Sequence, residues 1–159
     1  MCQQFLDQML DEIRTNIQED SSEGMKQLVL YLFHEDWNIR KTASQIFSEG
    51  GIEAHDFLIF QISAESDQER KQTLCYWLTT IIREQSGIPV KLIEDLFQFG
   101  NHHIRKMVLD NNPNLGREEF TPFLYGLLAD DSWEIRERAS RNLIEMNEQV
   151  VPILERNFN

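Results

Sequence analysis

The sequence predicts an all-α protein built as a stacked array of antiparallel helix pairs. The stretch DWNIRKTAS at 36–44 returns as SWEIRERAS at 132–140 with five of nine letters unchanged. Between the two copies, arginine recurs at intervals of 30, 35 and 31 residues, at Arg40, Arg70, Arg105 and Arg136. No stretch of the chain shows the strict alternation of apolar and polar residues that is typical of a strand. A repeat of this length indicates stacked helical units, each of which buries its apolar face against its neighbours.

A polar residue that suits a helix N-cap lies four residues before each of these arginines. These residues are Asp36, Ser66, Asn101 and Ser132. An oxygen at this position accepts a hydrogen bond from a free N–H of the first helical turn, so we expect the second helix of each pair to begin here. Glu69 completes a capping box with Ser66. The residue after each arginine is Lys41, Lys71 and Lys106 in the first three units and Glu137 in the fourth.

An apolar segment with helical spacing precedes each cap and predicts the first helix of each pair. Helix ends are indicated by Gly50-Gly51, Gly87 and the run 111–113, and helix starts by Pro89 and Pro122. We therefore predict one domain over residues 1–159 with helix pairs at 23–50, 52–86, 89–112 and 115–146. Apolar stripes outside these pairs predict an N-terminal cap helix at 3–19 and a C-terminal cap helix at 148–157, which would close the open ends of the array.

The composition is that of one compact domain. The chain has 159 residues, 41% of them apolar, and a net charge of −12 that repels nucleic acids and anionic membranes. Cys2 and Cys75 are too few and too far apart for a disulfide framework or a zinc knuckle, and Cys75 is expected in the core. Without a secretory start or a long apolar run, we expect a cytoplasmic protein that does not bind membranes.

The turn motif resembles that of HEAT repeats, which read D-x-x-(Ile/Val)-R-x-x-A. DWNIRKTA and SWEIRERA match it, NHHIRKMV matches with Val108 in place of alanine, and DQERKQT matches at the arginine alone. The resemblance implies a right-handed α-solenoid of about four HEAT-like helix pairs with an extra helix at each end. The second helices would then line its concave face. It also implies a structural ladder between neighbouring repeats, formed by Asp36, Arg40, Arg70, Arg105 and Arg136, with Asp67 and Asp131 next to two of the caps.

The second helices carry the side chains best suited to hold a partner. The candidate partner-binding residues are Trp37, Lys41, Lys71, Lys106, Trp133 and Arg138. The lysines lie about 100° around the helix from the arginines, which places them towards solvent. The tryptophans at the two helix starts have two interpretations, a binding hot spot or a staple that packs on the preceding helix. Trp77, deeper in its helix, is expected to pack.

The sequence offers no site for chemistry. His102 and His103 are adjacent and point to different sides of a helix, while His34 and His55 lack a histidine at i+4, so we expect no metal site. No phosphate-binding glycine loop, nucleophile elbow or catalytic cysteine neighbourhood is present. We therefore expect no catalytic residues and no cofactor.

Three functions are compatible with these patterns. The first is a non-enzymatic scaffold or adaptor that binds a protein partner through the concave face of the solenoid. The second is a DNA-binding or DNA alkylation-repair protein, because SWEIRERASRNL resembles the helix-start pattern of the HEAT-like alkylpurine DNA glycosylases; the net charge of −12 disfavours it. The third is a phycobiliprotein lyase-like protein, since chains of that kind also carry HEAT-like repeats.

Overall fold

A computed structural model describes residues 8, 11 and 15 and the ranges 21–83, 85–110 and 112–157, with side chains in the last range up to residue 146. Within these ranges the chain forms helices and turns and no strand, which confirms the all-α prediction. None of the helices found there is long and apolar enough to cross a membrane. The predicted cap helix at 3–19 lies almost wholly outside the described residues.

The chain divides into two compact units, residues 1–81 and 82–159. The first unit holds α2 (Ser21–Tyr31), α3 (Trp37–Glu49), α4 (Gly51–Ala64) and most of α5 (Gln68–Arg83). The second holds α6 (Val90–Phe99), α7 (His102–Leu109), the 3₁₀ turns η1 (Pro113–Gly116) and η2 (Glu118–Phe120), α8 (Thr121–Leu127) and α9 (Trp133–Asn157).

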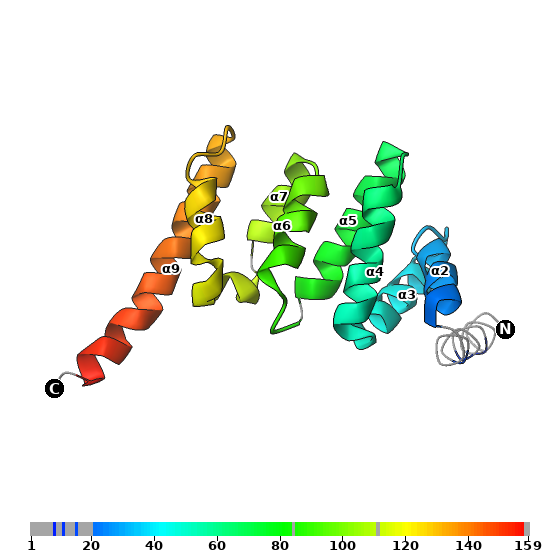
Figure 1. Ribbon diagram of the computed structural model, residues 1–159, viewed down its shortest axis with the longest axis horizontal. Coiled ribbons are helices and arrows are strands. Elements are labelled where there is room, and N and C mark those ends of the chain that lie inside the picture. Colours follow the sequence, from blue (N-terminus) through cyan, green and yellow to red (C-terminus); the bar gives the residue numbers. More distant parts are fainter. Residues whose placement is uncertain are drawn as a thin grey trace. The chain divides into compact units, whose positions relative to one another are not determined.

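The first unit is built on α2, α3 and α4, where α2 packs against both other helices (Figure 1). Its core is formed by Leu28, Leu32, Phe47, Leu58, Ile62, Leu74 and Leu78, all 2% exposed or less. Trp77 of α5 is buried there, and its indole N–H donates to the carbonyl of Leu32 at 3.1 Å. The packing role predicted for Trp77 is therefore confirmed.

Cys75 belongs to the same core, as predicted. Its thiol is fully buried and free. Burial raises the pKa of Cys75 to about 11. The thiolate, which is the reactive form, is therefore scarce at neutral pH, and Cys75 acts as a small apolar residue.

Two glycines allow α3 to turn directly into α4. Gly51 has φ 62°, a left-handed conformation that side chains disfavour. At Gly50, an added Cβ would lie 2.7 Å from the Cβ of Ala54. Gly50-Gly51 thus ends α3, as the sequence predicts.

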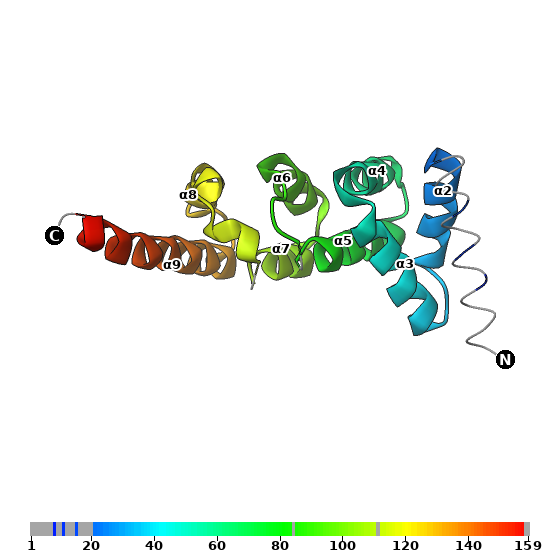
Figure 2. The same cartoon turned by 90° about the horizontal axis from the view of Figure 1, so that it is seen from below.

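The second unit has two layers, with α6 and α8 in one and α7 and α9 in the other (Figure 2). Its core includes Ile93, Leu96, Val108, Leu115, Phe120, Leu124, Ile135 and Ala139, none of them accessible to solvent. Asn114, 1% exposed, ties the loop after α5 to η1. Its amide donates to the carbonyl of Gln85 at 2.9 Å, and its Oδ1 accepts from the N–H of Ile88 at 3.3 Å.

One helix of this unit begins where the sequence indicates, and another runs longer than predicted. α8 begins at Thr121 with Pro122 in its first turn, as expected from Pro122, and residues 113–120 before it form the two 3₁₀ turns. α9 runs unbroken to Asn157, where the sequence analysis expects one helix to end at 146 and a separate cap helix to occupy 148–157. No glycine or proline lies between Met146 and Glu148 to end the helix there.

The predicted caps hold at two helices and fail at a third. Asp36 accepts from the N–H of Asn38 at 2.8 Å, and Asn101 accepts from the N–H of Ile104 at 3.0 Å. At α5, however, Asp67 and not Ser66 accepts from the first turn, through the N–H of Arg70 at 2.9 Å. A charged carboxylate also interacts favourably with the positive end of the helix dipole, which a serine hydroxyl does not do.

This correction shifts the register of α5 by one residue. The helices α3, α5, α7 and α9 follow Asp36, Asp67, Asn101 and Ser132, at intervals of 31, 34 and 31 residues. The fourth helical residue donates its N–H to the carbonyl of that preceding residue in every case; these residues are Arg40, Lys71, Arg105 and Arg136. Arg70 instead occupies the third position, which is a buried isoleucine in the other three helices (Ile39, Ile104 and Ile135). The predicted equivalence of Arg70 with the other arginines is therefore wrong.

Replacing Asp67 with alanine tests the corrected register. We expect Asp67→Ala to lower the free energy of unfolding by about 1 kcal/mol, because a first-turn N–H loses its acceptor. The matched substitution Ser66→Ala should change it by less than about 0.5 kcal/mol. Urea denaturation followed by circular dichroism gives both values, and a larger loss for Ser66→Ala would restore the original register.

A second test concerns the buried histidine of α4. His55 is fully buried, and neither ring nitrogen has a hydrogen-bond partner among the described residues. Burial lowers the pKa of His55 below 6.5, and the charge of Asp56 opposes this shift in part. Above pH 6.5 both folded and unfolded states are neutral; below it the unfolded state takes up the proton first. Stability should therefore fall as the pH drops below 6.5.

His55→Leu should remove this acid sensitivity. At pH 7.5 we expect the free energy of unfolding to rise by about 1 kcal/mol, because two unpaired polar atoms leave the core. The gain in melting temperature should grow between pH 7 and pH 5. His103→Leu, at an exposed position, is the control and should keep the wild-type pH profile. Parallel pH profiles for wild type and His55→Leu would contradict this account.

Candidate interaction surface

The turns before α3, α5 and α9, three of the second helices of the pairs, contain the same hydrogen bond. In each, the backbone N–H of the last residue before the helix donates to the side chain two residues earlier. The pairs are Asp36 to His34 Nδ1 at 3.0 Å, Asp67 to Glu65 Oε1 at 3.0 Å and Ser132 to Asp130 Oδ1 at 2.9 Å. Each turn is thus held in place before its helix begins, so the first side chains of these helices are presented on an ordered backbone.

Arg40 and Arg136 each donate hydrogen bonds to two backbone carbonyls of the turn that precedes their helix. Nη1 of Arg40 donates to the carbonyls of His34 and Glu35 at 2.5 and 2.8 Å. Nη1 of Arg136 donates to the carbonyls of Asp130 and Asp131 at 2.6 and 3.0 Å. Both guanidinium groups therefore satisfy backbone carbonyls within their own helix pair.

Arg105 makes a contact of a different kind. Its Nη2 donates to the carboxylate of Asp130, which lies in the turn before α9, and its guanidinium lies 4.4 Å from the ring of Phe97. Only 12% of the Asp130 side chain is exposed. Within the described part of the chain, Arg105 is thus the predicted ladder residue that forms an ion pair with the neighbouring pair of helices.

Arg70 lies over Phe33, with 4.0 Å between the guanidinium carbon and the ring centroid, and its Nε is 3.1 Å from Glu65 Oε2. The Arg70 side chain is 45% exposed, so its charge stays at the surface over the Phe33 ring, at the helix position where the other three helices have a buried isoleucine. Glu65 also accepts a hydrogen bond from the backbone N–H of Asp67. This hydrogen bond is the largest cause of a lowered pKa of Glu65, and the hydrogen bond from Arg70 is the next.

A row of polar contacts joins α7 to α9, and we call it the α7–α9 seam. It consists of His102, Lys106 and Asp110 on one side and Glu134, Arg138 and Asn142 on the other. Its contacts are His102–Glu134 at 2.7 Å, Lys106–Glu134 at 3.3 Å, Arg138–Asp110 at 2.8 Å and the Asn142 amide to the Leu109 carbonyl at 3.1 Å. The hydrogen bonds from His102 and then Lys106 hold the pKa of Glu134 below its usual value.

The seam uses two of the predicted partner-binding residues. The side chains of Lys106 and Arg138 are 28% and 18% exposed, and both have carboxylate partners inside the second unit. Each side of the seam is spaced at i, i+4 and i+8, so its members face one way on their helix. Lys106 and Arg138 thus hold two helices together in the isolated chain.

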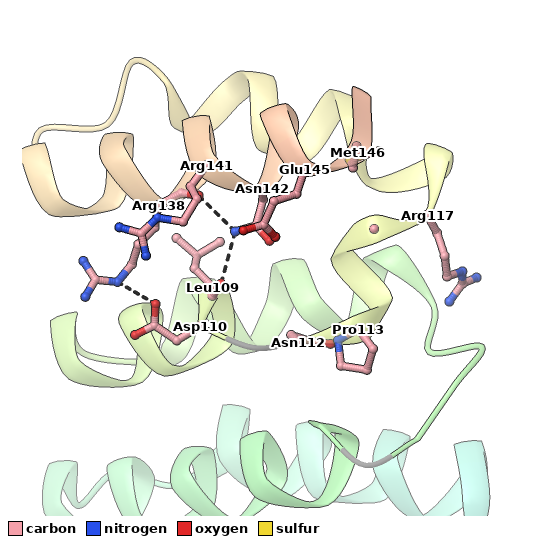
Figure 3. Close-up of a pocket in the computed structure, with 11 residues that line it drawn as sticks. Leu109, Asp110, Asn112, Pro113, Arg117, Arg138, Arg141, Asn142, Glu145 and Met146 are labelled. Carbon is pink, nitrogen blue, oxygen red and sulfur yellow. Dashed lines mark hydrogen bonds and ion pairs between the residues drawn. The ribbon is translucent and has the colours of Figure 1, made fainter. Parts of the chain in front are cut away.

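A groove of about 700 Å³ lies between η1 and α9 and includes one end of the seam, since Asp110, Arg138 and Asn142 line it (Figure 3). It exists because α7 ends at Leu109 while α9 continues for several more turns. Three arginines line it, and each has a carboxylate partner: Arg117 with Glu119, Arg138 with Asp110 and Arg141 with Glu137. Their positive charges are therefore locally compensated, which makes the groove a poor site for an anion.

Trp37 and Lys41 remain accessible at the start of α3. The tryptophan is the first residue of the helix and is 54% exposed. The ammonium group of Lys41 lies 5.1 Å from the centroid of its ring, a cation–π contact across one helical turn. Lys71 is the fourth residue of α5, as Arg40 is of α3, and it is partly buried.

Trp133 occupies the same position at the start of α9 and is more accessible, at 66%. The residue one turn later is Glu137 instead of lysine. Of the six predicted partner-binding residues, the structure thus leaves Trp37, Lys41 and Trp133 exposed to solvent, and the two tryptophans are equivalent in register.

The described residues contain no group of three histidine, cysteine or acidic side chains that could hold a metal ion. No protein-family model, no curated protein and no solved structure matches this chain.

The sequence interpretation missed the carboxylate partners of the seam. His102 and Lys106 are four residues apart on α7, and Glu134 and Arg138, which carry opposite charges, are four residues apart on α9. That spacing is a signal for two facing rows. Pairing the rows required knowing that α7 and α9 are neighbours.

Arginine-to-alanine substitutions separate the buried contact from a surface contact. We expect Arg105→Ala to lower the free energy of unfolding by about 1–3 kcal/mol, because it leaves the mostly buried Asp130 carboxylate without its partner. Arg141→Ala breaks a pair whose side chains are 58% and 47% exposed, and should cost less than about 0.5 kcal/mol. Thermal and urea denaturation measure both, and equal losses would refute the distinction.

Proposed function

We propose that this chain is a non-enzymatic protein-interaction module, a scaffold or adaptor of the HEAT-like type that binds a cytoplasmic protein through its second helices. In this proposal the helix pairs form a right-handed solenoid of about four repeats. The observation that carries it is the exposure of Trp37 and Trp133 at the same position of α3 and α9.

An exposed tryptophan at an ordered helix start is well suited to bind a protein partner. Tryptophan carries one of the largest apolar surfaces of any residue, and it is enriched among the few residues that dominate binding energy at protein interfaces. The turns before α3 and α9 are held by the hydrogen bonds of Arg40 and Arg136, so both rings are presented on a preorganised backbone. Little conformational entropy would be lost when a partner covers them.

The distribution of positive charge favours a protein partner over DNA. Arg40 and Arg136 are turned to backbone carbonyls, and Lys106 and Arg138 are paired with carboxylates. Binding a phosphate backbone would require these cations to exchange partners within a chain of net charge −12.

Affinity capture from native lysate, with and without nuclease, tests the proposal. We expect a protein that is enriched in both samples, and we expect it to bind the purified chain directly. In the double variant Trp37→Ala/Trp133→Ala its affinity should fall by about 30-fold or more, since each central interface tryptophan contributes about 1–2 kcal/mol or more. Isothermal titration calorimetry gives the affinities.

Phe60→Ala is the matched control, because Phe60 is 64% exposed, similar to the two tryptophans, but lies on α4, the first helix of its pair. It should leave the affinity within about twofold of wild type. Enrichment that vanishes after nuclease treatment would instead support a nucleic-acid-binding function. A partner whose affinity depends on Phe60 and on neither tryptophan would contradict the assignment of the surface.

A further inference from the structure

The two exposed tryptophans differ in what covers the ring. At Trp37 the chain supplies its own cation, Lys41, one turn along α3 at 5.1 Å from the ring centroid. At Trp133 the corresponding residue is Glu137. Among the described residues, the other cation–ring contacts involve Phe33, Phe97 and Phe120, and none involves Trp133. One position of the repeat thus has a filled cation site and its equivalent has an open one.

The surroundings of Trp133 favour a cation. Glu137 lies one turn away on the same side of α9, and Asp131 and Glu134 lie within two residues along the chain. Asp131 is exposed, and the Glu137 side chain is 47% exposed. These carboxylates oppose the positive end of the α9 dipole, which would otherwise repel a cation at a helix start.

In the described part of the chain, the cations near Trp133 contact groups other than its ring. Lys106 contacts Glu134 and Arg136 holds the carbonyls of its own turn. Arg141 contacts Oε1 of Glu137, and Nη1 of Arg138 lies 4.0 Å from Oε2 of Glu137, whose side chain stays 47% exposed. Since no cation of the described residues covers the Trp133 ring, the ring is open to a cation from another molecule. The net charge of −12 attracts basic groups from solution.

We propose that Trp133 and the carboxylates of Asp131 and Glu137 bind an arginine or lysine side chain from a basic segment of the partner protein. The bound cation takes the place over Trp133 that Lys41 takes over Trp37. This inference rests on the proposed function, since it names the chemistry of the partner at one of the two tryptophans.

A capped hexa-arginine peptide is the probe. Its affinity for the whole chain is measured at low salt by isothermal titration calorimetry, and the indole N–H signals of the tryptophans are followed by NMR. We expect the Trp133 signal to shift on titration. Trp133→Ala should weaken binding about three- to fivefold. Trp133→Phe, which keeps an aromatic ring and removes only part of its π surface, should weaken it less.

Glu137→Lys is the decisive variant, because it places a lysine at the register of Lys41 and fills the site from within. It should weaken peptide binding at least as much as Trp133→Ala. Glu118→Lys is the matched control, because it makes the same change in net charge at an exposed residue. Glu118 lies in η2, before α8, whereas Trp133 lies after α8. Glu118→Lys and Trp37→Ala should stay within about twofold of wild type.

The outcomes separate this inference from the proposed function. Equal weakening by Glu137→Lys and Glu118→Lys, or an unshifted Trp133 signal, would show that the peptide senses only net charge and would overturn the inference. Wild-type chain that does not bind the peptide would overturn it as well. If a captured protein still depends on the tryptophans in that case, the proposed function stands. If the peptide binds as expected but no protein is captured, the proposed function fails and the cation site remains.

Discussion

The hydrogen bonds at the start of the second helices set the register on which the rest of this structure depends. Once Asp36 or Asp67 caps a helix, the identity of its first residue is determined, and with it the direction of every later side chain. The seventh helical position is buried in all four second helices, as Ala43, Leu74, Val108 and Ala139. The capping hydrogen bonds, which lie outside the core, thus determine which residues of the second helices face the core.

The same register distributes the charged residues. The first and fifth residues of α7, His102 and Lys106, meet the second residue of α9, Glu134, in the α7–α9 seam. Lys106 and Arg138, two of the cations predicted to bind a partner, are instead paired with carboxylates in this seam. The tryptophans at the first residues of α3 and α9 remain exposed to solvent.

How much of this was predictable follows from the range of each interaction. Capping acts over two or three residues, so the starts of α3 and α7 could be read from Asp36 and Asn101. At α5 two good caps are adjacent, Ser66 and Asp67, and the capping-box pattern of Ser66 with Glu69 favoured the wrong one. The seam joins residues about 30 positions apart, and its pairs depend on which helices are neighbours. The exposure of Trp37 and Trp133 likewise depends on packing, because a tryptophan at a helix start suits both a staple and a free surface.

We propose that a partner protein covers the starts of α3 and α9. The decisive experiment is amide hydrogen exchange, measured on the chain alone and in complex with the captured protein. We expect residues 37–41 and 133–137 to exchange more slowly in the complex, while exchange on the outer face of α4 is unchanged. Protection confined to α4, around the exposed side chains of Ile52 and Phe60, would contradict it.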